Sequence, residues 1–323
     1  MRRPLQQALT ALALAVAAVG ASAQEFPNKP VRVVIPYAAG GSTDILTRQM
    51  SQKLTARLGQ SVIVENRAGA NGIIGTEAVA KAAPDGYTLL MVTNGQTISM
   101  GLYPKLPWDL EKDFLPVVNV ATMPNVIVVH PSQPFQTLKD LLDAVRARPG
   151  ALSYAHAGVG SPQHIAGELF KLVTKARIEQ IPYKGGGPAI ADVVAGQVPV
   201  GVGGLPVVRQ HIGNGRLRAL ALTSSARSAL MPDIPTVAET GFPPFDAIFW
   251  IGLLAPKGTP ESVIARVNSD VNTVLKDPDI AASFAVQGAT PAGGTAAAFG
   301  AWIRQDIETS TRVIREANIK PEG

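Results

Sequence analysis

The sequence contains no cysteine among its 323 residues. This absence excludes disulfide bonds, zinc sites built on thiolates and catalysis by a thiol nucleophile. It also excludes attachment of a lipid to a cysteine at a processed N-terminus. A folded form of this chain must therefore depend on its apolar core, which a 46% content of hydrophobic residues can supply.

The motifs of several enzyme and cofactor classes are also missing. The chain has no GxxxxGK[ST] phosphate loop, no GxGxxG dinucleotide motif, no GxSxG nucleophile elbow and no HExxH metal motif. Its histidines, His130, His156, His164 and His211, do not have the spacing of metal ligands on one helix face. The sequence thus predicts no catalytic residue, no metal site and no cofactor.

The first 23 residues have the three parts of a secretory signal peptide. Arg2 and Arg3 precede an apolar run at Leu9–Gly20, and Ala21-Ser22-Ala23 then offers small residues to a signal peptidase. The alternative is a membrane anchor, but this run of about 12 residues is shorter than the roughly 20 that span a bilayer. No second run of spanning length occurs. We therefore expect cleavage after Ala23 and export to the periplasm.

The mature chain would hold 300 residues, which is more than a single core usually carries, so we expect two lobes. Loss of the two signal-peptide arginines lowers the net charge from +5 to about +3. The remaining basic residues are scattered and form no dense face with interleaved aromatics, so nucleic acid is not an expected partner. We expect a monomer.

Alternating strand and helix patterns predict an α/β fold with parallel sheets covered by helices. Strands are expected at 31–37, 61–65, 88–93, 124–130, 152–157, 177–183, 198–202, 217–222 and 247–254. Helices are expected at 46–58, 72–82, 138–148, 161–176, 188–195, 261–276 and 295–317. The alternation restarts near Pro124, and two segments, 115–125 and 245–255, are placed to cross between lobes. We predict a hinged protein whose first lobe is discontinuous, with residues 24–120 and 250–323, and whose second lobe holds residues 121–249.

The first candidate binding segment joins the first strand to the first helix. Ligands of open α/β sheets bind at the carboxyl ends of strands, and helix N-termini offer free N–H groups and a positive dipole end to an anion. Glycines let the ligand approach the backbone closely, and an acidic residue in the first turn complements the helix dipole. The alternative is an ordinary tight turn. The candidate residues are Tyr37, Ala39, Gly40, Gly41, Ser42 and Asp44.

The second candidate segment repeats this geometry in the other lobe, at Gly158, Val159, Gly160, Ser161 and His164. Ser161 is a good N-cap with Pro162 after it, and His164 could instead be an ordinary hydrogen-bonded structural histidine. Further segments that follow strands could line the same cleft. Their candidate residues are Thr93, Asn94, Gly95, Gln96, Tyr183, Lys184 and Gly204.

Motifs along the whole chain resemble those of the solute-binding receptors of tripartite tricarboxylate transporters, the Bug family. They are Pro27–Gly41, Glu65–Ala70, Ala83–Leu90, Leu152–Ala155, Pro182–Pro188, Leu217–Ala221 and Pro232–Glu239. The resemblance implies a type II periplasmic-binding-protein fold with two α/β lobes. It also implies a receptor that closes on a small carboxylate, held largely by backbone groups and ordered water, and delivers it to a two-component inner-membrane permease. The family pocket falls on Tyr37–Asp44, Thr93–Gln96, Gly158–His164 and Tyr183–Gly185.

Two departures from the family pattern lie near this expected cleft. Val200–Pro206 lacks the acidic or amide residue that many members carry, and His156 stands where a small residue is frequent. Both bear on which carboxylate is bound. Two alternative functions stay open at this point. One is a ligand-sensing receptor for a signalling partner, and the other is a secreted hydrolase that uses Ser161 and His164.

Overall fold

The computed structural model describes residues 26–37, 39–183, 185–243 and 246–321. The predicted signal peptide, its cleavage site and Lys184 lie outside these residues. Within the described ranges, no helix combines the length and the apolar character needed to cross a bilayer.

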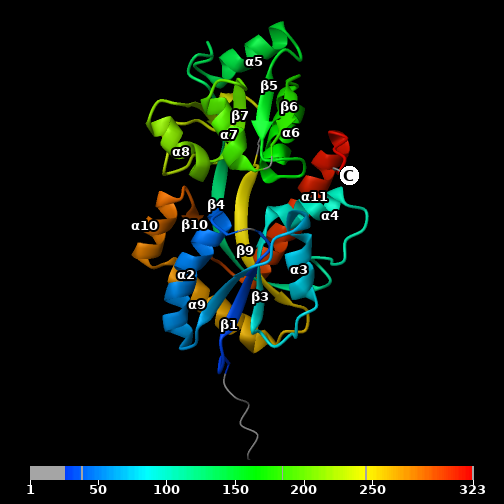
Figure 1. Cartoon of the computed structure of the whole chain (residues 1–323), viewed down its shortest axis with the longest axis vertical. Coiled ribbons are helices and arrows are strands. Elements are labelled where there is room, and N and C mark those ends of the chain that lie inside the picture. The colour runs from blue at the N-terminus through cyan, green and yellow to red at the C-terminus, as the bar shows by residue number, and fades with distance from the viewer. Residues whose placement is uncertain (1–25, 38, 184, 244–245, 322–323) are drawn as a thin grey trace, which may run out of the picture.

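The first lobe, at the bottom of Figure 1, is built on three parallel strands in the order β2-β1-β3. These strands are β1 (Val31–Ile35), β2 (Val62–Asn66) and β3 (Thr88–Thr93). The elements packed in this lobe are α2 (Ser42–Leu58), η1 (Ala70–Gly72), α3 (Ile73–Ala80), α4 (Asn94–Leu102), α9 (Glu261–Leu275), α10 (Pro278–Val286), β10 (Thr290–Pro291) and α11 (Ala296–Glu316). The helix predicted at 46–58 is α2, which buries the apolar stripe Leu46, Met50, Leu54 and Leu58. Gly59 ends that helix in the left-handed conformation.

The second lobe, green in Figure 1, contains parallel β5 and β6, with β7 parallel to β5. Its strands are β5 (Ser153–His156), β6 (Glu179–Pro182), β7 (Val200–Gly204) and β8 (Arg218–Leu222). Its helices are α5 (Leu138–Ala147), α6 (Pro162–Thr174), α7 (Gly186–Val194), α8 (Leu205–Gly213) and η2 (Ala238–Thr240).

Two antiparallel strands, β4 (Phe114–Val129) and β9 (Ile248–Pro256), run between the lobes (Figure 1). From Phe114 to Pro124, β4 pairs with β9, and from Asn125 to Val129 it pairs with β7. The apolar clusters separate in the same way, since one set gathers around β1, β3 and β9 and another around β5, β7 and β8. The predicted architecture of two α/β lobes with two crossings is therefore present. The lobe boundaries at 120/121 and 249/250 fall inside the crossing strands and stay a prediction.

Three elements differ from the expectations. The segment after β3 is the helix α4, which was not predicted and which Thr93 and Gln96 cap reciprocally. Leu205–Gly213 forms an unpredicted helix, α8, which carries a proline in its first turn. The strand β4 starts ten residues before the expected position, because register shifts near Pro116 and Asn119 let it pair with β9 despite these residues.

Candidate functional site

The loop after β1 is held from within by Asp44, one turn into α2. The Gly40 N–H donates to Asp44 Oδ2 over 3.0 Å, and Arg48 Nε donates to Asp44 Oδ1 over 3.0 Å. Burial acts to raise the pKa of Asp44, but the hydrogen bonds from Arg48 and Gly40 outweigh it and leave that pKa below its usual value. Asn66 donates to the Tyr37 carbonyl oxygen over 3.1 Å at the start of the loop. Both oxygens of Asp44 are thus engaged within the protein, which gives this residue a supporting place in the site.

The N-terminus of α2 offers backbone donors to solvent. Ala39, Gly40 and Gly41 are exposed, and the N-cap Gly41 provides no side-chain hydrogen bond. Among the described residues, the N–H groups of Gly41, Ser42 and Thr43 have no hydrogen-bond partner. Free N–H groups at the positive end of a helix dipole suit a carboxylate.

Tyr37 lies in a polar network at the carboxyl ends of β1 and β3. Its hydroxyl is 2.9 Å from Thr93 Oγ1 and accepts from Gln96 Nε2 over 3.0 Å. The Thr93 N–H donates to Gln96 Oε1 over 2.9 Å, which closes the capping box of α4. Burial raises the pKa of Tyr37, so the phenol stays neutral. The structure therefore places Tyr37, Thr93, Gly95 and Gln96 in contact with one another, and their place in a ligand cleft stays a prediction.

The glycine at the start of α3 leaves room for this network. Gly72 has φ +90°, and a Cβ there would lie 2.6 Å from Gln96 Nε2. We expect Gly72→Ala to lower the free energy of unfolding by about 2–5 kcal/mol, since a left-handed alanine costs about 1–2 kcal/mol and overpacking adds about 1–3 kcal/mol. Urea unfolding without ligand measures the change.

Gly40→Ala is the matched control for that substitution. Gly40 has a similar φ of +86°, but nothing lies within 4 Å of its added Cβ. It should lose only the backbone term of about 1–2 kcal/mol. Equal losses in the two variants would contradict the packing role given to Gly72.

The second candidate loop, Ala157–Ser161, joins β5 to α6. Gly158 and Gly160 have φ of +113° and +73°, conformations that L side chains adopt with strain. Ser161 caps α6 by accepting from the His164 N–H over 3.1 Å, and Pro162 follows it, both as predicted. The Ser161 N–H donates to the Gly158 carbonyl oxygen over 3.1 Å. This loop is thus a tight, glycine-dependent start to α6.

The imidazole of His164 lies beneath this loop, in the core of the second lobe. Its side chain is only 2% exposed and stacks on His156, with 4.4 Å between ring centroids. Its Nδ1 accepts from the Gly160 N–H over 3.1 Å. Burial, with smaller contributions from the charges of His156 and Lys171, lowers the pKa of His164 to about 3. The Ser161 hydroxyl accepts from the backbone N–H of His164, and no hydrogen bond joins that hydroxyl to the His164 ring among the described residues.

Two further candidates, Tyr183 and Gly204, lie near this loop. Tyr183 donates its hydroxyl to Asp192 Oδ2 over 2.7 Å, and burial followed by this hydrogen bond raises its pKa to about 12. The Tyr183 carbonyl oxygen would be 2.9 Å from a Cβ on Gly158, so the backbone of Tyr183 packs against the loop. Gly204, at the end of β7, lies near Gln163, whose Nε2 donates to Asn125 Oδ1 over 3.2 Å. Asn125 was not predicted, and Gln163 was included only as part of the Gly158–His164 segment that the family resemblance implies.

The two lobes meet on both sides of the hinge. On one side, a Cβ on Gly160 would lie 2.6 Å from Leu102 Cδ2 of α4. Here an apolar cluster joins residues of α4, α6 and α11, and Figure 1 shows α11 beside the second lobe. On the other side, Arg209 Nη1 of α8 donates to the Ala285 carbonyl oxygen of α10 over 2.6 Å. The second loop thus touches the far end of α4, the helix whose first turn holds the Tyr37 network.

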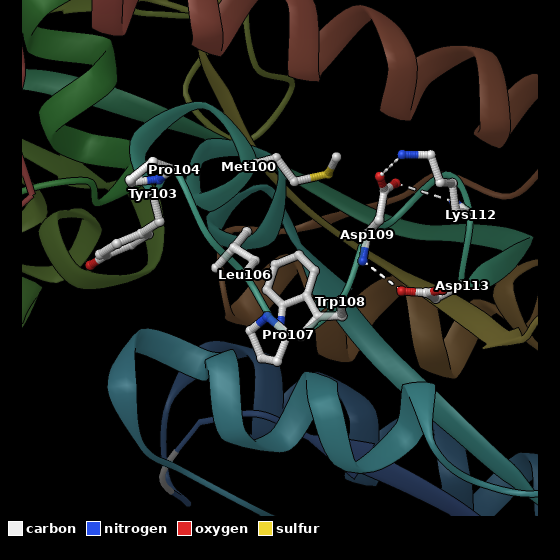
Figure 2. Close-up of a pocket in the computed structure, with 9 residues that line it drawn as sticks. All are labelled: Met100, Tyr103, Pro104, Leu106, Pro107, Trp108, Asp109, Lys112 and Asp113. Atoms are coloured by element: carbon white, nitrogen blue, oxygen red, sulfur yellow. Dashed lines mark hydrogen bonds and ion pairs between the residues drawn. The ribbon is translucent and has the colours of Figure 1, made fainter.

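A groove of about 500 Å³ opens elsewhere on the first lobe (Figure 2). Trp108 at its base donates to the Ile73 carbonyl oxygen over 3.2 Å, and Asp109 pairs with Lys112 at its rim. None of the sequence-predicted site residues lines it. Its lining residues are Met100, Tyr103, Pro104, Leu106, Pro107, Trp108, Asp109, Lys112 and Asp113.

Two α/β lobes, two crossing strands and a glycine-rich helix start in each lobe together define a two-lobed solute-binding receptor. Within that class, residues 46–319 match the family described as tripartite tricarboxylate transporter family receptor, and the chain belongs to this family. The predicted fold class and the predicted resemblance to the Bug family are both confirmed.

Three relatives show how far the similarity extends. The chain is 40% identical to Protein BugT of Bordetella pertussis, over 96% of this chain and 95% of that protein. The structure of R. palustris Rpa4515 with adipate is 33% identical with a TM-score of 0.82, over 92% of this chain and all of the other. MatC from Rhodopseudomonas palustris with bound malate is 31% identical with a TM-score of 0.78, over 90% of this chain and all of the other. The family is one of solute-binding receptors, which supports a binding role over a catalytic one.

Proposed function

We propose that this protein is a periplasmic receptor that captures a small carboxylate between its lobes and delivers it to a two-component inner-membrane permease of the tripartite tricarboxylate type. One observation carries the proposal. Each lobe presents a helix start at the carboxyl end of a strand, α2 after β1 and α6 after β5, with backbone N–H groups that have no partner among the described residues. Two relatives of the same fold were solved with the dicarboxylates adipate and malate.

The proposed ligand contacts are mostly main-chain donors. In the first lobe they are the amides of Gly41, Ser42 and Thr43, and in the second lobe those of Val159 and Gln163. A carboxylate at these positions would be stabilised by N–H dipoles and helix ends, each contributing typically about 0.3–1 kcal/mol through the dipole in addition to the hydrogen bonds. No protonated side chain is required, in agreement with the low pKa of His164.

The other predicted site residues divide by what they contact. Asp44, Tyr183 and His164 direct their polar side-chain atoms to protein partners, so we assign them to the support of the loops. The polar side-chain atoms of Tyr37, Thr93, Gln96 and Ser161 also bond within the protein, so we assign these side chains to the support of the loops as well. The residues that remain proposed to line the cleft are Ala39, Gly40, Gly41, Ser42, Asn94, Gly95, Gly158, Val159, Gly160 and Gly204. Lys184, outside the described residues, stays a prediction.

Thermal unfolding of the mature protein, residues 24–323, in a panel of carboxylates tests the binding step. The panel holds adipate, malate, citrate, glutamate and nicotinate, each beside its amide or ester analogue as an uncharged control. A ligand at a hundredfold excess over its Kd stabilises the folded state by about 2.7 kcal/mol, which raises the melting temperature by several degrees. At least one carboxylate should give this rise and its uncharged analogue should not. A melting temperature that no acid moves would contradict the proposal.

Delivery needs a separate experiment, because a sensory receptor would bind in the same way. Cells that contain the permease should accumulate the radiolabelled carboxylate only when the receptor is present. Capture of a signalling partner, with uptake independent of the receptor, would instead support the sensory role.

A further inference from the structure

The two glycine amides of the second loop are both held by histidine side chains. The Gly160 N–H donates to His164 Nδ1 over 3.1 Å. His156 Nδ1 lies 3.2 Å from the Gly158 nitrogen and 3.1 Å from the Gly158 carbonyl oxygen, and because Nε2 donates to Gln180 Oε1, Nδ1 of the neutral ring accepts from the Gly158 N–H. Both glycines have positive φ, a conformation that glycine adopts without a steric cost and other residues do not, so the loop depends on glycine at these two positions. The loop is thus tied at two alternate residues to the side chains beneath it.

The two imidazoles form one rigid unit across the elements that flank the loop. His156 ends β5 and His164 lies in the first turn of α6, and their rings stack with an angle of 13° between planes. His156 Nε2 also contacts Gln180 Oε1 on β6. Both side chains are buried, with exposed fractions of 0% and 2%. A ligand in the cleft would therefore meet the loop and not these rings.

The protonation state of His164 follows from its hydrogen bond. Because Nδ1 accepts from an amide, the ring proton is on Nε2, which lies 3.9 Å from Glu168 Oε1. An imidazolium would carry a second proton on Nδ1, directed at the Gly160 N–H, and the contact would be lost. The titratable groups around this ring are His156 and Tyr154 on β5 and Glu168 and Lys171 on α6. Glu168 also accepts from Tyr154 and Lys171, so its charge is already paired.

The hydrogen bonds to the two histidines occupy the Gly158 and Gly160 N–H groups, which leaves other N–H groups of this segment to bind a ligand. Ser161 N–H and His164 N–H have partners within the α6 cap. The Val159 and Gln163 N–H groups have none among the hydrogen bonds of the described residues. These are the two second-lobe donors of the proposed function.

We propose that His156 and His164 are positioning residues, which hold the Ala157–Ser161 loop so that the Val159 and Gln163 amides are directed at the carboxylate. The inference rests on the proposed function and assigns these side chains a role in binding without ligand contact. It also replaces the predicted ligand contact of His164 and gives a purpose to His156, the residue that departs from the family pattern.

A matched pair of amide substitutions tests this role. Asparagine places its side-chain oxygen near the position of Nδ1, so His164→Asn keeps the acceptor for Gly160. Glutamine places its polar atoms near the position of Nε2, so His164→Gln keeps a buried amide but loses that acceptor. Both variants lose the stacking on His156, and both should unfold at similar temperatures.

Calorimetric titration with malate and adipate gives the first readout. We expect His164→Gln to weaken binding about tenfold, as the loss of a loop-positioning hydrogen bond implies, and His164→Asn to stay within about threefold of the wild type. Equal affinities in the two variants, whether both retained or both lost, would overturn the proposal.

Amide hydrogen exchange at Gly160 gives a second readout that needs no ligand. The amide should be protected in the wild type and in His164→Asn and should exchange faster in His164→Gln. Suppose that this difference in exchange is found but the wild type binds no carboxylate. The histidine then supports the loop, and the proposed function fails. If instead the wild type binds a carboxylate but Gly160 exchanges equally fast in all three proteins, the proposed function stands and the positioning role is overturned.

Discussion

Acidification from pH 6.5 toward pH 3 should destabilise the wild-type protein through His164. A histidine whose folded pKa is about 3, against its ordinary value of 6.5, binds its proton only in the unfolded chain over this interval. The contribution of the neutral His164 to the free energy of unfolding is therefore fully present above pH 6.5 and is lost as the pH falls toward 3. The slope is up to about 1.4 kcal/mol per pH unit, which amounts to about 2–3 kcal/mol between pH 7 and pH 4.5.

Urea unfolding of the wild type and His164→Asn between pH 4.5 and pH 7 measures this contribution. Asparagine does not titrate, so the variant should lack this part of the pH dependence. Carboxylates with lowered pKa values, such as Asp44 and Glu65, lose their stabilisation mainly below pH 4 and are common to both proteins. Parallel stability curves for the two proteins would show that His164 is not kept neutral by burial.

Gly160→Val should weaken carboxylate binding by about a hundredfold or more. Overpacking a contact costs about 1–3 kcal/mol, and a loss of about 2.7 kcal/mol in binding free energy raises the Kd a hundredfold. A Cβ at residue 160 would lie 2.6 Å from Leu102 Cδ2, across the contact between the lobes. The left-handed φ of +73° adds backbone strain. The valine would thus have two effects: it would distort the second loop and push that loop away from α4. Calorimetric titration with malate and adipate measures the loss.

Two controls separate these effects. Gly215 lies in the same lobe with φ +69° and has nothing within 4 Å of an added Cβ, so Gly215→Val should bind as the wild type does. Leu102→Ala removes the atom that the new side chain would strike, so adding it to Gly160→Val should restore part of the affinity. No restoration would show that the effect is confined to the loop backbone and does not involve the contact between lobes.

Much of the fold could be predicted because local patterns agree with the tertiary structure. β3 has the predicted bounds, and the period-four stripe of α2 is the face that the sheet buries. α4 was missed because Asn94-Gly95 is typical of a turn, although Thr93 and Gln96 have the spacing of a capping box. The first part of β4 was missed because its Pro116 and Asn119 break a strand pattern, and only pairing with β9, more than a hundred residues away, defines it.

The candidate site was predicted only as far as main-chain geometry follows from glycines and caps. Ser161 was identified as an N-cap from its type and position alone. The stacking of His156 on His164 could not be, because it depends on how β5 packs against α6. The hydroxyl of Tyr183 is directed at Asp192 on α7, a partner that no local pattern indicates. Side-chain roles in this protein are therefore set by packing between elements, while the loops themselves follow from the sequence.

The central claim is that backbone amides at the starts of α2 and α6 hold a carboxylate between the lobes. Amide NMR of the ¹⁵N-labelled mature protein, titrated with the carboxylate that gives the largest thermal shift, tests it most directly. The account predicts that the amide resonances of Ser42, Thr43, Val159 and Gln163 shift together, with saturation at one equivalent. Shifts confined to the groove lined by Tyr103 and Trp108, or to one lobe only, would contradict it.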